Sequence, residues 1–157
     1  MNDRLFEIDS NANLNALYII AFMTMHNREI GIKTLIVSLF LMKYPNICLE
    51  LLDARDKKLF KNSLENWEIN NLQNEMHKYT SAVYDEGFNN GMAFLYSRNL
   101  ITYDLEKDII SMSKEANGIQ TNSIPKNLII RAKFVSKVIS MYSLEELEYK
   151  IKEGKKV

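Results

Sequence analysis

The chain has 157 residues, of which 46% are hydrophobic and 25% are charged, the proportions of an ordinary globular domain. Twenty Lys and Arg residues balance 20 Asp and Glu residues, so the formal net charge is zero. A dedicated nucleic-acid-binding protein usually has a basic excess, and this balance argues against that class. The single cysteine, Cys48, excludes an internal disulfide framework.

The sequence predicts a cytoplasmic, helix-rich chain that does not contact a membrane. No basic stretch followed by an apolar run is present at the N-terminus, so we expect no signal peptide. The most apolar stretches, 17–23 and 35–42, are shorter than the roughly 18 residues that a spanning helix needs. Only 5 Gly and 2 Pro interrupt the chain, which favours helices.

Two very apolar helices are predicted at the start of the chain and form the expected centre of the core. The first covers about 11–26 after a cap at Asp9 or Ser10. The second covers about 32–43 and ends before Pro45, because the residue before proline resists helical geometry.

The middle of the chain is predicted to hold a short helix, an exposed segment and a long amphipathic helix. The short helix covers 46–54, and the charged residues 53–61 are expected to be exposed. Ser63 is the expected cap of the long helix. The apolar residues of this long helix recur roughly every three or four positions and form one face. They are Leu64, Trp67, Leu72, Met76, Tyr79 and Val83.

A further helix is predicted up to Arg98, and it contains two glycines on one face. Gly87 and Gly91 are four residues apart. Each weakens a helix by about 1 kcal/mol relative to alanine. We therefore expect another backbone to come close along this face.

Two short β-capable runs follow that helix, 100–103 and 109–112, joined by a charged turn. A helix that leads into a β-hairpin is the layout of a winged helix-turn-helix. The alternative is a plain hairpin between helices. The predicted fold is thus mainly α, with a winged-helix-like part near residues 80–112.

The C-terminal part is predicted to contain a polar loop over 114–123 and two helices. Pro125 suits the first turn of one helix, and Ser143 with Glu146 forms a capping box at the start of the last. We expect one domain over 1–157, made of an apolar helical part (1–61), a winged-helix-like part (62–112) and C-terminal helices (124–157).

The sequence contains no recognised arrangement for catalysis, so we expect no enzymatic activity, cofactor or metal. Cys48 lies between two apolar residues and is expected to be buried. His26 lies at a helix end and His77 on a predicted helix. No zinc-ligand spacing and no Gly-rich phosphate loop is present. An enzyme built on these three residues remains an alternative.

The predicted recognition helix, 84–98, is poorly suited to reading DNA. It begins with Asp85 and Glu86 and has one cation, Arg98, whereas base and phosphate readout needs Arg or Lys. Protein binding therefore fits the winged helix better. The candidate interface residues are Trp67, Tyr84, Phe88 and Tyr96, with Tyr103 and Lys107 on the wing. The same aromatics are at least equally consistent with core positions.

A basic stripe on the penultimate helix is the best candidate for contact with phosphate or an acidic partner. Its residues are Lys126, Arg131, Lys133 and Lys137. The alternative is that the stripe is only the solvated side of an amphipathic helix.

The order of these segments resembles the middle component of three-component ABC ATPase systems, a family that includes the small third subunit of Lamassu-type defence systems. The resemblance is carried by an Asn-rich start to an apolar helix (13–20), a second apolar helix (33–43) and the wing sequence 99–104. It continues through 131–137 and a closing helix over 143–152. Ser136 stands where the family has glycine.

The resemblance implies a non-enzymatic adaptor in antiviral and plasmid defence. Such a subunit would lie between a coiled-coil ABC ATPase, similar to SMC or Rad50 proteins, and a nuclease-like effector that is held inactive until foreign DNA is sensed. DNA would be contacted indirectly through the complex. The alternative function is a stand-alone winged-helix transcriptional regulator that binds operator DNA.

Overall fold

A computed structural model describes residues 12–69, 86–118 and 121–155. The part described is mainly helical with one small antiparallel sheet, which confirms the predicted fold class. The helices are α1 (Ala12–Met25), α2 (Ile32–Lys43), α3 (Pro45–Leu51), α4 (Ala54–Ser63), α5 (Asn66–Ile69), α7 (Glu86–Ser97), α8 (Lys126–Met141) and α9 (Leu144–Lys155). The strands are β1 (Glu29–Gly31), β2 (Ile101–Asp104) and β3 (Ile109–Met112), and the 3-10 helices are η4 (Glu115–Gly118) and η5 (Thr121–Ser123).

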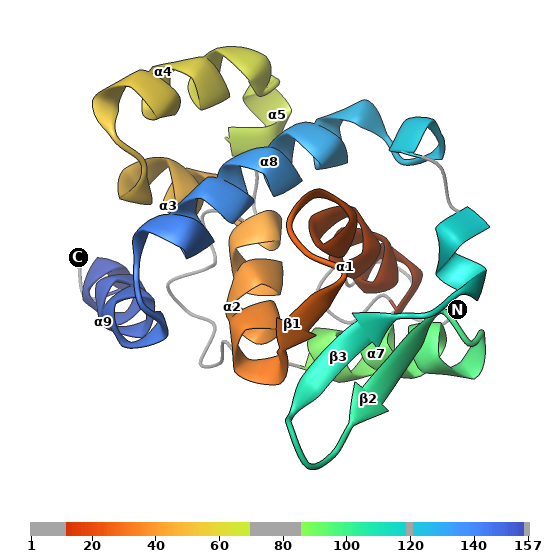
Figure 1. Ribbon diagram of the computed structural model, residues 1–157. Helices are drawn as coiled ribbons and strands as arrows, with labels where there is room; N and C mark the ends of the chain where they lie inside the picture. The colour runs from red at the N-terminus through yellow and green to blue at the C-terminus, as the bar shows by residue number, and fades with distance from the viewer. Residues whose placement is uncertain (1–11, 70–85, 119–120, 156–157) are drawn as a thin grey trace, which may run out of the picture.

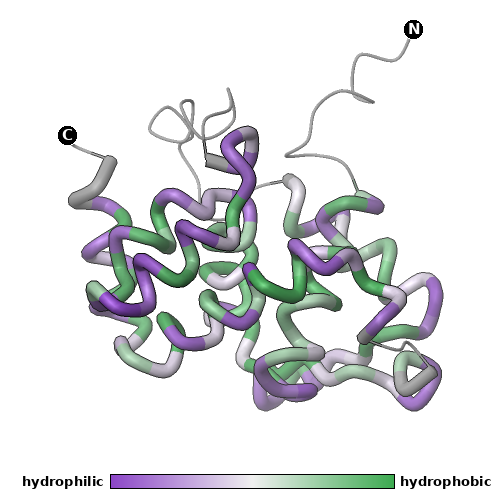
Figure 2. Tube along the Cα trace, turned by 90° about the horizontal axis from the view of Figure 1, so that it is seen from above, coloured by the Kyte–Doolittle hydropathy of each residue, from purple (hydrophilic) through white to green (hydrophobic). Residues whose placement is uncertain are grey.

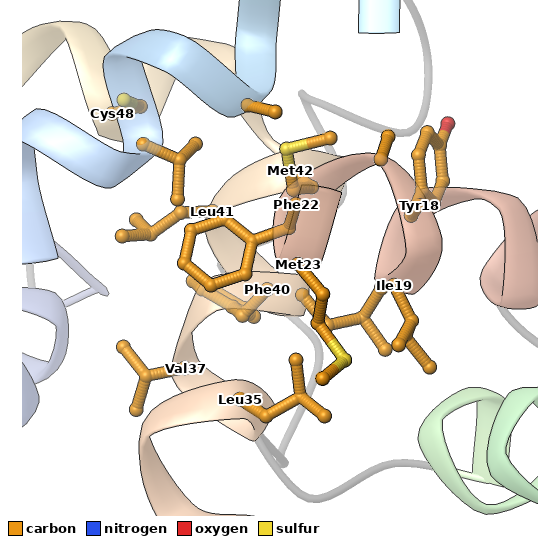
Figure 3. Packing of buried hydrophobic residues seen from close by; sticks show 14 of the residues in the cluster. Tyr18, Ile19, Phe22, Met23, Leu35, Val37, Phe40, Leu41, Met42 and Cys48 are labelled. Carbon is orange, nitrogen blue, oxygen red and sulfur yellow. The ribbon is translucent and has the colours of Figure 1, made fainter. Parts of the chain in front are cut away.

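The core is built around α1 and α2, which lie at the centre of the molecule (Figure 1). Both helices are buried on nearly all sides, as their continuous apolar sequences predict. Figure 3 shows Phe22 of α1 among residues of α2, including Leu41 and Met42. Phe22, Leu41 and Met42 are fully buried. The predicted bounds of α2 are confirmed, and α1 matches its prediction to within one residue at each end.

The predicted hairpin is confirmed and gains a third strand that the sequence did not reveal. Strand order is β1–β3–β2, with Ile110 of β3 opposite both Ile30 and Tyr103. The strand β1 has three residues and only Ile30 is buried, so its local pattern is too short to recognise. Pairing with residues about 80 positions later is what makes it a strand. The motif is winged-helix-like: α1, β1 and α2 come first, and α7 and the β2–β3 hairpin follow later in the chain.

The helix α7 packs closely against α1, as the paired glycines predicted. A Cβ atom on Gly91 would lie 3.0 Å from the Asn15 Cβ and 3.1 Å from the Ala16 backbone nitrogen. Only glycine fits this approach without displacing a backbone. Gly87, one turn earlier, is also buried.

The charged residues of segment 53–61 are exposed or partly exposed, as predicted, and most of the segment belongs to the helix α4. Asp53 caps α4 by accepting a hydrogen bond from the Asp56 backbone N–H at 2.8 Å. Phe60 anchors the helix in the core, with its ring centroid 4.7 Å from that of Phe134 in α8.

Ser63 was predicted to cap the helix that follows it, and this prediction was wrong because Ser63 is the last residue of α4. Its hydroxyl donates to the Phe60 carbonyl at 2.8 Å. The next helix, α5, is described only over Asn66–Ile69. The remainder of the predicted long helix, including its apolar positions from Leu72 to Val83, lies outside the described residues, as do the predicted caps Asp9 and Ser10.

The helices α8 and α9 close the other side of the core. The capping box of α9 is confirmed, since the Ser143 backbone N–H donates to Glu146 and the Glu146 N–H donates to the Ser143 hydroxyl. Leu147 and Ile151 of α9 are buried. Hydrophilic and hydrophobic positions alternate along these outer helices (Figure 2).

No single helix among the described residues has both the length and the apolar composition to cross a membrane. The helices α2 and α3 pass such a test together, but their axes meet at 109°. Both belong to the core, where most of their residues are buried.

Candidate binding surfaces

The wing is a hydrogen-bonded turn that presents an apolar side chain to solvent. One Asp104 carboxylate oxygen accepts the backbone N–H groups of Glu106 and Lys107 at 3.0 and 3.2 Å. The Tyr103 hydroxyl donates to Asp108 at 2.6 Å, and this hydrogen bond raises the pKa of Tyr103. Between these anchors Leu105 is 80% exposed. The sequence singled out Tyr103 and Lys107 on the wing but missed Leu105, because exposure of one leucine has no signature in the sequence.

The helix α7 exposes one large aromatic ring, that of Tyr96, which is 65% accessible. Phe88, which was also a candidate interface residue, is buried in the core on the side that faces α1, so that assignment was wrong. The end of α7 is fixed by Asn99, which adopts a positive φ of 59°, and by the hydrogen bond from the Leu100 N–H to the Leu95 carbonyl. This geometry turns the chain directly into β2.

We call α7 and the β2–β3 hairpin together the winged-helix face. Between residues 87 and 112 this face has three carboxylates, Asp104, Glu106 and Asp108, and two cations, Arg98 and Lys107. The Arg98 guanidinium carbon lies 3.6 Å from the centroid of the Phe94 ring, so its planar group stacks on its own helix. With more carboxylates than cations, this face lacks the excess of Lys and Arg that DNA readout uses.

Of the other two candidate interface residues, Trp67 lies on a different helix and Tyr84 lies outside the described residues. Trp67 of α5 is 60% exposed. Tyr84 lies outside the described residues, as does His77.

The predicted basic stripe on α8 loses one member in the structure. Arg131 is buried, and its Nε and Nη2 donate to Glu68 Oε1 at 3.1 and 2.9 Å. Its Nη1 donates to the Met42 carbonyl at 3.0 Å. Arg131 therefore joins α8 to α5 and α2, and its inclusion in a surface stripe was wrong. In helical phase it lies on the same side as Phe134 and Val138, which face inward.

The other three members of the stripe lie on one side of α8. Lys126 and Lys133 are exposed. Lys137 is partly exposed, and its Nζ lies 2.9 Å from Asp56 Oδ1 of α4. An open hollow of about 450 Å³ lies beside this pair, lined by residues of α4 and α8 that include Asp53, Ser136 and Met141.

Ser136 of α8 faces His26, one of the three residues on which an enzyme could be built. Its hydroxyl lies 2.6 Å from His26 Nδ1, and the His26 ring stacks on Phe22 with centroids 5.0 Å apart. Ser136 is in the interior of α8, where backbone N–H groups are engaged in helical hydrogen bonds. A serine there has no adjacent backbone donors to stabilise an oxyanion. The geometry is that of a contact between α1 and α8.

Acidification is expected to weaken the fold through His26. Burial lowers its pKa below the ordinary value of 6.5, so the unfolded chain binds this proton more tightly than the folded chain does. The stability contributed by the neutral ring is therefore present above about pH 6.5 and is lost as the pH falls below it. Urea unfolding at pH 7.5 and pH 5.5 should show a smaller loss of stability in His26→Asn than in the unchanged chain. An equal loss in both would contradict the assignment.

Cys48 is fully buried, and burial raises the pKa of its thiol to about 12. Because only the thiolate reacts rapidly, we expect Ellman's reagent at pH 8 to label the folded chain at least about 100-fold more slowly than the urea-unfolded chain. The chain has one cysteine, so the signal is unambiguous. Similar rates in both states would show that the thiol is accessible and would restore it as a candidate nucleophile.

No cluster of three or more His, Cys, Asp or Glu side chains that could hold a metal ion occurs in the part of the chain that the structure describes. Comparison with known proteins gives no further assignment: no family model, no curated protein and no solved structure matches this chain.

Proposed function

We propose that the chain is a non-enzymatic adaptor whose winged-helix face docks onto another protein. The observation that carries this proposal is the exposure of Tyr96 and Leu105 on a face with more carboxylates than cations. Exposed aromatic and aliphatic side chains are typical anchors of protein interfaces. The acidic residues Asp104, Glu106 and Asp108 would suit a partner whose apolar recess is bordered by Lys or Arg.

The resemblance to the middle component of three-component ABC ATPase systems supplies the partners of this proposal. They are a coiled-coil ATPase similar to SMC or Rad50 proteins and a nuclease-like effector. The adaptor would join them and help to hold the effector inactive until the ATPase senses foreign DNA. The neutral total charge and the acidic wing agree with a subunit whose winged helix binds protein instead of DNA.

The test is affinity purification of the tagged full chain from its native host, followed by mass spectrometry. The unchanged chain should recover an ATPase and an effector in a fixed ratio. The double variant Tyr96→Ala/Leu105→Ser should recover at least about tenfold less, because loss of interface anchors weakens binding by 2 kcal/mol or more. Tyr149→Ala removes another exposed tyrosine, on α9, and is the matched control.

Two outcomes would overturn the proposal. Equal recovery by the double variant would show that the winged-helix face is not the docking surface. Recovery of no partner, together with a specific shift of the chain's own promoter DNA, would favour the stand-alone regulator.

A further inference from the structure

A second surface, on the helices α4 and α8, has the opposite charge. Without the buried Arg131, these two helices contain seven Lys and Arg residues and one carboxylate, Asp56, and a second carboxylate, Asp53, caps the start of α4. They lie away from the β2–β3 hairpin (Figure 1). The zero net charge of the chain therefore hides a separation of charge between this surface and the wing.

The packing of α4 against α8 brings two helices rich in lysine and arginine side by side. Phe60 of α4 contacts Phe134 of α8. Asp56, one turn before Phe60, pairs with Lys137, one turn after Phe134, so the two helices run antiparallel side by side. Arg55 and Lys58 lie on the side of α4 that faces away from Phe60, three residues apart. We call these two cations and the three on the solvent side of α8 the basic face, which comprises Arg55, Lys58, Lys126, Lys133 and Lys137.

Most of these cations are available to a ligand. Among the described residues, Arg55, Lys58, Lys126 and Lys133 are exposed and have no salt-bridge partner. Lys137 is the exception, since Asp56 neutralises it. An ion pair at the protein surface is worth at most about 1 kcal/mol, so even this lysine can exchange its partner for a phosphate.

We infer that the basic face binds the sugar–phosphate backbone of duplex DNA, without reading its sequence. The row from Lys126 to Lys137 follows α8, a helix about 24 Å long, and duplex DNA offers one negative charge for about every 1.7 Å of its axis. Such a dense line of phosphates needs no matching pocket. Binding to it requires several exposed cations, and α4 and α8 present four that have no salt-bridge partner among the described residues.

An acidic protein is less well suited to this surface. The cores of protein interfaces are enriched in aromatic side chains. The large hydrophobic residues that α4 and α8 expose are Leu59 and Met141, and neither is aromatic. The exposed rings of the described residues, Trp67, Tyr96 and Tyr149, are on other helices. The inference is independent of the adaptor proposal, because it uses a different face of the molecule.

The test is fluorescence anisotropy of a labelled 30-base-pair duplex with the full chain, over a series of salt concentrations. We expect a Kd on the order of 10⁻⁵ M at low salt, in the range of nonspecific DNA binding. The variant Lys58→Gln/Lys126→Gln/Lys133→Gln should bind at least about tenfold more weakly. Loss of three phosphate contacts should also lower the slope of log K against log salt by roughly 2.7.

The matched control is Lys33→Gln/Lys114→Gln/Lys152→Gln, which removes the same charge from exposed lysines elsewhere. It should keep most of the affinity and the slope, and thermal unfolding should show that both variants are folded. Three results would overturn the inference: no binding by the unchanged chain at low salt, equal weakening by both variants, or displacement of DNA by poly-glutamate at equal charge. The last result would assign the surface to an acidic protein.

Discussion

Glu68→Ala is expected to lower the free energy of unfolding by about 3–5 kcal/mol, because it leaves the Arg131 guanidinium charged and unpaired in the core. The side chains of Arg131 and Glu68 are 6% and 1% exposed, and the shortest distance between them is 2.9 Å. The second oxygen of Glu68 accepts the Glu65 backbone N–H at 2.8 Å, so the same substitution also removes the cap of α5. The measurement is equilibrium urea unfolding of the full chain.

Two companion variants separate this ion pair from ordinary surface charge effects. Lys57→Ala breaks the exposed contact with Glu50, at 3.7 Å, and should change stability by less than about 1 kcal/mol. The double variant Glu68→Met/Arg131→Met should lose much less stability than the sum of the two single Met substitutions, because neither charge is then left buried alone. Additive losses would show that the two charges are not coupled.

Gly91→Val is expected to destabilise the fold by about 1–3 kcal/mol, through overpacking where α7 meets α1. Two of the three atoms nearest a Cβ at this position are backbone atoms, the Ala16 nitrogen and the Asn15 carbonyl carbon, both at 3.1 Å. Backbone atoms inside a buried helix cannot rotate away, so α1 and α7 must separate. Thermal or urea unfolding gives the size of the effect.

Ala93→Val is the matched control, since Ala93 is exposed on the same helix. There valine costs only its lower helix propensity, about 0.5 kcal/mol. If Gly91→Val were no more harmful than Ala93→Val, the close approach of the two helices would be wrong. A Gly91→Val variant that stays folded but loses partner recovery would extend the role of this contact to the position of the winged-helix face.

The sequence predicted those parts of the fold that depend on short-range physics. The bounds of α2 follow from an apolar run and Pro45, and the start of α9 follows from the Ser143 and Glu146 capping box. The β2–β3 hairpin follows from two short β-capable runs. Even one long-range contact was foreseen at Gly91, because a glycine pair inside a helix is destabilising unless another backbone needs the space.

Tertiary structure alone decided which side chains are buried and which are available for binding. Arg131 and Phe88 appeared as surface candidates, and packing against α5 and α1 places both in the interior. The strand β1 exists only through its pairing with β3, and the cation-bearing helices α4 and α8, far apart in the sequence, lie side by side only in the fold. A linear sequence specifies the period and polarity of each helix, but the burial of a side chain depends on neighbours that are distant in the chain. The winged-helix face and the basic face are for that reason properties of the folded molecule.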